Sequence, residues 1–259
     1  MRRTQQRYSR PNRPTARCSL SRRYSNDAYL NAAIGLFGNA DNFWRGHRSA
    51  HYPLVAGVFR REPNESPEAQ LILRFSGRAG ARRNRLPRRD ERIDWLLLAQ
   101  HYGLPTRLLD WSLSALVALF FAVEAAEADD RNDACLYALN ASGLNQAMGR
   151  RRALVHLDDP IVSGMAEQAF GASTSRHLPD AIALDLFESD KRMMLQRAGF
   201  TLHSSRRDLS GPGSEKYLVK FLIPRRAKPK LRWLLQLAGI SRSSLFPDLP
   251  TLAEEIRRG

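Results

Sequence analysis

The stretch from residue 100 to residue 123 constrains the fold of this chain more than any other. Its second half, residues 113–123, reads LSALVALFFAV and predicts a helix over residues 113–128. That helix must be buried because its first half is apolar nearly all round. The first half of the stretch, residues 100–112, reads QHYGLPTRLLDWS. It carries polar and aromatic side chains that a core segment does not need. A loop fixed by a buried helix is a favourable place for a site. The alternative is that Asp110 or Ser112 only caps the helix and Arg107 only pairs with a carboxylate.

Net charge sets the N-terminal segment apart from the rest of the chain. The 259 residues carry a net charge of +15, and eight arginines without any acidic residue lie in residues 1–25. This segment has too few apolar side chains to offset the entropy of ordering, so we expect a disordered basic arm over 1–25. An arm that binds nucleic acid or a membrane surface, a transit-like segment, and a start codon upstream of the true one would each explain it. Residues 26–259 are expected to form a single domain.

Cysteine content and hydropathy exclude several classes of protein. The chain has two cysteines, Cys18 and Cys135, and no CxxC or His/Cys spacing typical of a metal site. The apolar run 113–123 is well short of the roughly 20 residues that span a bilayer. No apolar segment of a secretory signal follows the basic start. We therefore expect a soluble cytoplasmic protein without a disulfide framework, a bound metal or a transmembrane segment.

The order of the predicted elements indicates the fold class. Apolar periodicity and capping residues predict helices over residues 27–37, 68–75, 93–100, 113–128 and 228–238. A last short helix is expected to start among Ser243 or Ser244, Pro247 and Asp248. Strands are predicted at 42–46, 134–139 and 216–223, and an exposed loop at 77–89. Residues 143–179 show little periodicity and receive no element. This irregular alternation predicts an α+β fold, with a small mixed or antiparallel sheet flanked by helices.

Three short blocks of the sequence resemble the FRG domain family. The first is FWRG at residues 43–46, followed by Leu54 and Arg60. The second is WLLLAQHYGLPTRLLDWS at 95–112, followed by ALFFA at 118–122. The third runs from residue 192 to residue 201 and contains Arg192, Gln196, Gly199, Phe200 and Thr201. The resemblance spans residues 42–240. The chain departs from the family pattern at three positions: Trp44 for the usual Phe, His47 for a frequent Gln, and Gly199 one place later than expected.

The first block is similar to the first motif of Arg-type ADP-ribosyltransferases, in which that arginine holds the dinucleotide. The resemblance implies that NAD or another nucleotide binds at Arg45, whose planar guanidinium suits phosphate, and that Gly46 permits close approach of the backbone. Tyr102 or Trp111 would stack on nicotinamide, and His101 would contact ribose. The remaining candidates are Asp110 and Arg107 as catalytic residues and Gln196 as a binding residue. No late glutamate of the transferase type is convincingly placed, so Asp110 is the preferred carboxylate. We expect Arg45, residues 101–112 and residues 192–201 to converge on one pocket.

Two other functions compete with this hypothesis. The basic arm and the arginine cluster between Arg78 and Arg92 are typical of a nucleic-acid-binding module or nuclease, although no aromatic residue lies among residues 77–92. The third hypothesis is a regulatory or interaction domain without catalysis, in which the motifs are core and capping residues. Trp111 would then be an aromatic plug, Ser112 a helix cap, and Arg45 the partner of Asp110 in a structural ion pair.

Overall fold

The computed structural model describes residues 42–62, 65–82, 85–124, 131–173, 177–185, 191–246 and 248–258. The chain divides into two units, Met1–Gly38 and Asn39–Gly259, and all the described residues belong to the second. The basic arm expected at 1–25 and the helix expected at 27–37 lie outside the described residues.

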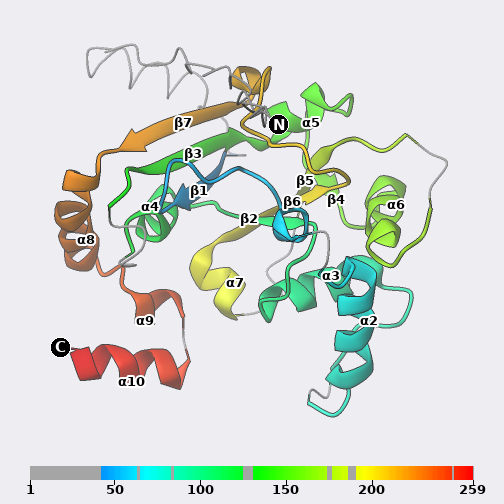
Figure 1. Ribbon diagram of the computed structural model, residues 1–259, viewed down its shortest axis with the longest axis horizontal. Helices are drawn as coiled ribbons and strands as arrows, with labels where there is room; N and C mark the ends of the chain where they lie inside the picture. The colour runs from blue at the N-terminus through cyan, green and yellow to red at the C-terminus, as the bar shows by residue number, and fades with distance from the viewer. Residues whose placement is uncertain are drawn as a thin grey trace, which may run out of the picture. The chain divides into compact units, whose positions relative to one another are not determined.

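A seven-stranded mixed sheet forms the centre of the described residues (Figure 1). Its strand order is β4-β5-β6-β2-β1-β3-β7, and every neighbouring pair is antiparallel except β4 and β5. The strands are β1 Asn42–His47, β2 Leu108–Ser112, β3 Ala134–Asn140, β4 Val155–His156, β5 Ala181–Asp185, β6 Ala198–His203 and β7 Leu218–Ile223. Helices surround this sheet, which confirms the predicted α+β class.

The helices fall between the strands without a regular alternation. They are α2 Glu68–Ala79, α3 Arg92–His101, α4 Ala115–Val123, α5 Ala141–Ala147, α6 Pro160–Ala169, α7 Lys191–Gln196, α8 Lys228–Leu237, α9 Arg242–Leu245 and α10 Leu249–Arg258. Short 3-10 turns occur at Gly57–Arg60, Ser214–Lys216 and Arg225–Ala227. None of the described helices is long and apolar enough to cross a membrane.

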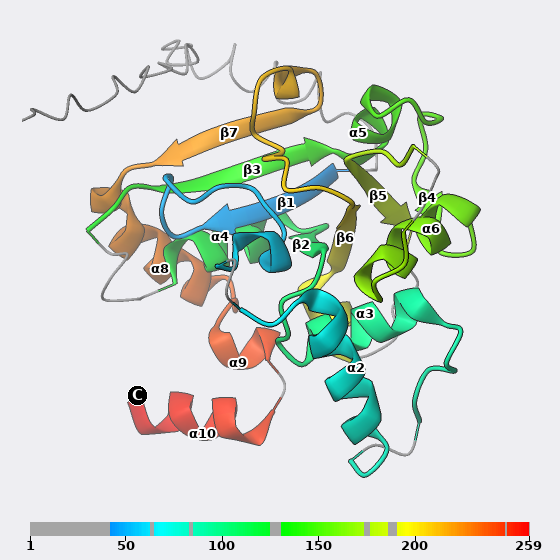
Figure 2. The same ribbon diagram turned by 45° about the vertical axis from the view of Figure 1, so that its right-hand side comes forward.

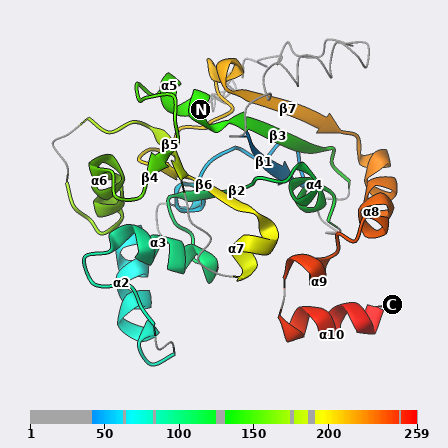
Figure 3. The ribbon, with the colours of Figure 1, turned by 180° about the vertical axis from the view of Figure 1, so that it is seen from behind.

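Side chains alternate between two buried faces of the sheet, as the pleat of a strand requires. On one face, Phe43, Leu109 and Tyr137 pack with residues of the loops around Leu54 and Leu209. On the other face, α4 and α8 cover the β3 and β7 side, and α2, α3 and α6 cover the β2, β6 and β5 side. Figures 2 and 3 show these two groups of helices separated along the sheet. A central strand in this arrangement is buried on both sides.

Most of the predicted elements are confirmed within a few residues, and the differences have physical causes. The structure confirms β1, β3, β7, α2, α3, α4 and α8, and the predicted loop at 77–89 begins after α2 ends at Ala79. Residues 143–179, which received no element, contain most of α5 and all of β4 and α6. The last short helix, expected to start among Ser243 or Ser244, Pro247 and Asp248, is present as two helices, α9 and α10. At the start of α10 the Asp248 carboxylate accepts a hydrogen bond from the Thr251 backbone N–H.

The polar block holds the main surprise, because residues 108–112 form a strand and not a loop. Leu108 and Leu109 are both buried since β2 lies in the middle of the sheet, and a strand buried on both faces lacks the alternation that identifies an amphipathic strand. The helix that follows starts at Ala115, and Ser114 caps it by accepting a hydrogen bond from the Val117 backbone N–H. The alternative in which Asp110 or Ser112 caps this helix is therefore wrong.

Candidate functional site

The candidate site lies where β1 and β2 separate. These two strands pair in register at Trp44 and Ser112, whereas all five residues of β2 pair with β6 on its other side. Beyond the Trp44–Ser112 pair, the Arg45 side chain reaches across to β2: its Nη1 donates a hydrogen bond of 2.5 Å to the backbone oxygen of Asp110. The same nitrogen lies 4.0 Å from the Asp110 carboxylate. The Arg45 guanidinium thus bridges β1 and β2 beyond the point where backbone hydrogen bonds join these strands.

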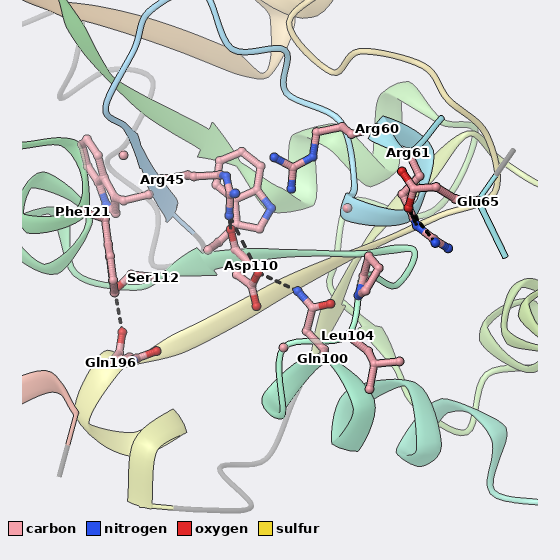
Figure 4. Close-up of a pocket in the computed structure, with 16 residues that line it drawn as sticks. Arg45, Arg60, Arg61, Glu65, Gln100, Leu104, Asp110, Ser112, Phe121 and Gln196 are labelled. Atoms are coloured by element: carbon pink, nitrogen blue, oxygen red, sulfur yellow. Dashed lines mark hydrogen bonds and ion pairs between the residues drawn. The ribbon is translucent and has the colours of Figure 1, made fainter. Parts of the chain in front are cut away.

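A pocket of about 590 Å³ opens at this split (Figure 4). Its charged lining residues are Arg45, Arg60, Arg61, Glu65 and Asp110, its aromatic ones are Trp44, Trp111 and Phe121, and its amides are Gln100 and Gln196. Loop residues 103–105 and Gly57 complete the wall beside Gly46 and Ser112. This volume lies within the range of about 300–1,000 Å³ typical of small-molecule sites.

The pocket carries uncompensated positive charge. Arg61 is neutralised by Glu65, whose carboxylate lies 2.7 Å from the guanidinium. Burial lowers the pKa of Arg45, the charge of Asp110 opposes this effect, and the nearby Arg60 lowers the pKa further. Arg60 points toward Arg45 across the pocket (Figure 4). No carboxylate among the described residues lies within ion-pair distance of Arg60. Two arginines therefore face one carboxylate, which favours an anionic ligand.

Asp110 is oriented by side chains of its own sequence block. Gln100 Nε2 donates a 2.7 Å hydrogen bond to Asp110 Oδ2, and Thr106 Oγ1 donates one of 2.7 Å to Gln100 Oε1. Thr106 Oγ1 in turn accepts a hydrogen bond from the Leu108 backbone N–H. The Asp110 side chain is 52% exposed, and its Oδ1 makes no hydrogen bond to the described residues. A fixed carboxylate thus presents one oxygen to the pocket.

His47 holds the other side of the Arg45 guanidinium. Arg45 Nε donates a 3.0 Å hydrogen bond to His47 Nε2. Burial, followed by the charge of Arg45, lowers the pKa of His47 to about 3, so the imidazole is neutral at physiological pH. Because Nε2 accepts, the proton must lie on Nδ1. His47 and the glutamine that is frequent at this position in the family share the ability to accept from an arginine.

Comparison with known families assigns this region. Residues 40–131 match the model of the FRG domain. These residues are an FRG domain. All the described residues that line the pocket lie within the FRG domain except Gln196, so the domain builds nearly the whole wall. The match ends at residue 131, before the third block at 192–201. The chain matches no curated protein and no solved structure.

The structure brings part of the predicted site together. Arg45, Gly46, Asp110, Trp111 and Gln196 all line the pocket of the FRG domain, so the first block, the end of the second block and part of the third converge. Of the third block, Gln196 lines the pocket and Gly199 lies in β6. The Arg192 side chain lies outside the described part of the structure.

Three predicted site residues lie outside the pocket wall. Arg107 is buried, and its Nε and Nη2 donate hydrogen bonds of 3.0 and 2.8 Å to Glu68. Its Nη1 donates to the backbone oxygen of Met165 and to Gln168. Tyr102 packs on Phe75 and on His101, with ring centroids 6.2 and 4.9 Å apart. Arg107 thus forms the carboxylate pair that the structural alternative predicted.

The side chains of Trp111 and Gln196 line the pocket but already have hydrogen-bond partners outside residues 40–131. Trp111 Nε1 donates to Thr201 Oγ1, which is hydrogen-bonded to His203 Nε2. Gln196 Nε2 donates to the backbone oxygen of Leu245. Trp111 is only 4% exposed and packs in the core, so little of its ring faces the pocket.

Two glycines of the motifs serve packing. A Cβ on Gly46 would meet the backbone oxygen of Ala118 at 2.0 Å, so α4 could not lie where it does on β1. A Cβ on Gly199 would meet the Phe43 ring at 3.1 Å. Gly46 was expected to allow close approach of a ligand. In the structure, α4 also needs the absence of a side chain at residue 46 in order to pack on β1. Gly199 links the third block to the aromatic residue of the first.

Sequence reasoning missed several lining residues of the FRG domain pocket. Arg60 and Gln100 lie in the recognised blocks but received no role, and Arg61, Glu65 and Phe121 received none either. The polar residues Gln100, Thr106 and Asp110 of the second block were a usable signal of a site, because they occur in a segment that also contributes core residues. Among the described residues, no three His, Cys, Asp or Glu side chains gather as a metal site.

Proposed function

We propose that the pocket of the FRG domain binds a phosphate-bearing nucleotide and acts on it as an ADP-ribosyltransferase-like enzyme, with NAD as the first substrate to test. The observation that carries this proposal is the pairing of two arginines, Arg45 and Arg60, with one fixed carboxylate, Asp110, in a pocket with aromatic walls. Guanidinium groups bind phosphate oxygens through paired hydrogen bonds, and aromatic rings stack on nucleotide bases.

The chemistry assigned to each group follows from its position. Arg45 and Arg60 hold the diphosphate, and Trp44 or Phe121 packs against a base. The bond between ribose C1′ and the nicotinamide nitrogen breaks, and its electron pair leaves with nicotinamide. Asp110 stabilises the positive charge that develops on the ribose. An acceptor nucleophile or water then bonds to C1′ and gives up its proton to solvent or to Asp110. Asp110 takes the role that a late glutamate has in the transferases, since no late glutamate of this chain is convincingly placed.

The decisive experiment measures nicotinamide release from NAD and, separately, ADP-ribose binding by calorimetry. Asp110→Asn is expected to lower kcat by about a hundredfold, and Arg60→Ala to weaken ADP-ribose binding by about tenfold because a charge-assisted contact is lost. Arg151→Ala removes the same charge from an exposed position outside the pocket wall and is expected to change neither. Absence of both nicotinamide release and ADP-ribose binding would contradict the proposal. Binding without turnover would favour the regulatory-domain alternative.

We also propose a second candidate function, non-specific nucleic-acid binding, which one surface supports independently. Five arginines are exposed at the end of α2 and in the segment after it: Arg78, Arg82, Arg85, Arg88 and Arg89. Such a cluster would contact phosphates without reading sequence. The logarithm of affinity for a DNA duplex should fall linearly with the logarithm of salt concentration, and Arg82→Gln with Arg85→Gln should lower the slope by about two. No retention of DNA at low salt would remove this candidate.

A further inference from the structure

Helix α8 has one face anchored in the protein and one face exposed. On the anchored face, Leu235 is buried against Ala122 and Val123, and Arg232 Nε donates to the backbone oxygen of Val123. On the opposite face, Trp233, Leu234 and Leu237 are 57%, 43% and 66% exposed. Trp233 and Leu237 are four residues apart and therefore lie one above the other on the helix. Soluble proteins seldom expose a contiguous group of large apolar side chains of this kind without a partner.

Basic residues border this apolar face. Lys230 is three residues before Trp233 and shares its side of the helix, and Arg226 lies one turn earlier; both are exposed. Residues 217–247 contain seven basic residues and no acidic residue. Figures 1 and 3 show α8 beyond the end of β7, at the opposite end of the sheet from α2 and α6. We define the α8 face as Arg226, Lys230, Trp233, Leu234 and Leu237.

We propose that the α8 face is a docking surface for an anionic lipid membrane. An amphipathic helix with Trp and Leu on one side and lysine or arginine at its border lies in the membrane interface. There the apolar side chains enter the acyl boundary while the cations meet anionic headgroups. No acidic residue of the segment 217–247 itself opposes such headgroups. Asp133 and Glu124, carboxylates of other segments that contact this one, bind Arg225 and Arg242, which are not part of the α8 face.

Two other occupants fit the α8 face less well. A second copy of the chain bound two-fold through the same face would bring Lys230 and Arg226 of both copies into one interface, and like charges disfavour that. Nucleic acid would satisfy the cations, but Leu234 and Leu237 have no partner on a phosphate backbone. A lipid surface satisfies both parts of the face. This inference does not depend on the proposed function of the pocket.

The test uses the full chain and vesicles of phosphatidylcholine with or without phosphatidylserine, separated by sedimentation. Because the arginines of residues 1–25 also attract anionic vesicles, the decisive variant keeps the charge constant. Trp233→Ala with Leu237→Ala is expected to weaken binding to phosphatidylserine vesicles by about tenfold, through lost apolar burial. The matched control, Leu73→Ala with Leu116→Ala, removes two exposed leucines of α2 and α4 and should leave binding unchanged.

Fluorescence provides a second readout that the basic arm cannot produce. Trp95 and Trp111 are buried and Trp44 is partly buried, whereas Trp233 is exposed. Vesicles should therefore shift the emission of Trp233 to shorter wavelength, and Trp233→Phe should bind and lose the shift. The proposal is overturned if binding is unaffected by the Trp233→Ala, Leu237→Ala change and no shift occurs. It is also overturned if the Trp233→Ala, Leu237→Ala variant keeps its binding to vesicles and loses only self-association or only the retention of RNA.

Discussion

At the scale of the residue, Arg45 is held by two acceptors that set its direction. His47 Nε2 accepts from Nε, and the Asp110 backbone oxygen accepts from Nη1. The remaining N–H donors of the guanidinium are then free to bind a ligand in a fixed orientation, which is what pre-organised recognition of phosphate requires. His47 is therefore a positioning residue for Arg45.

This role predicts different outcomes for two substitutions of His47. His47→Leu removes the acceptor and is expected to weaken ADP-ribose binding by about tenfold, the cost of a lost hydrogen bond to a charged group. His47→Gln supplies a carbonyl acceptor and should recover most of that affinity. Calorimetric titration checks both, with thermal unfolding as a control for folding. Equal loss of affinity in both variants would show that His47 does not act through its acceptor.

Arg107 is expected to act on stability. Arg107→Ala leaves Glu68 buried without its partner, and removing one member of a buried pair typically costs about 3–5 kcal/mol. Urea unfolding should show this loss, whereas Arg60→Ala, at an exposed position, should change stability by no more than about 0.5 kcal/mol. If Arg107→Ala instead abolished nicotinamide release at unchanged stability, the catalytic role expected from the sequence would stand.

The sequence identified residues of the site better than it separated their roles. Arg45 and Asp110 were recognised because their residue types and neighbours are unusual for a core segment. Arg107 and Asp110 looked equivalent, since both are charged residues of one block. What distinguishes them is burial against Glu68, which comes from a helix about forty residues earlier. No local pattern contains that information.

At the scale of the element, contact between β1 and α4 depends on the absence of a side chain at residue 46. Gly46→Ala would place a Cβ 2.0 Å from the backbone oxygen of Ala118, and a backbone atom cannot rotate away. We expect a loss of about 3 kcal/mol, at the upper end of overpacking costs. Gly77→Ala in α2 is the matched control: nothing lies within 4 Å of its added Cβ, so stability should rise by about 0.5–1 kcal/mol. Equal stability of the two variants in urea unfolding would contradict this account.

Three strands that sequence reasoning missed share one cause. β2, β5 and β6 lie next to one another in the sheet, and β2 and β5 are buried almost throughout. Their sequences therefore lack the alternation of apolar and polar residues that predicts a strand with one face in water. β1 and β3 were found because their aromatic and apolar runs are long enough to indicate a strand even without such alternation. Burial on both faces thus hid β2, which carries Asp110, although β1, which carries Arg45, was found.

At the scale of the whole molecule, the sheet order explains why distant blocks meet. β6 pairs with β2 over residues 108–112, and the carbonyl of Gln196, just before β6, accepts a 2.7 Å hydrogen bond from Ser112 Oγ. β1 lies on the other side of β2 and contributes Arg45. Convergence of these blocks was predicted because they resemble the motifs of a family. The order of strands, which is the physical reason, follows from long-range pairing that local patterns do not encode.

Two buried histidines make the stability of the fold dependent on pH. His47 and His203 both have a pKa lowered to about 3, mainly by burial and then by the charge of Arg45. In the unfolded chain each has a pKa near 6.5. Above about pH 6.5 both states are neutral and stability is constant. As the pH falls from about 6.5 toward 3, the unfolded chain binds protons that the folded protein does not, so stability is lost.

The loss should be on the order of 2–3 kcal/mol for each histidine at about pH 4.5, and urea unfolding at that pH and near neutrality measures it. Carboxylates also contribute in this range, so the variant His203→Gln isolates one histidine. Its amide keeps a group that can hydrogen-bond with Thr201 Oγ1 but cannot take up a proton, and stability should therefore fall less steeply with pH than in the native chain. His51→Gln, at an exposed position, should keep the native slope. An unchanged slope in His203→Gln would mean that this histidine is not kept neutral by the fold.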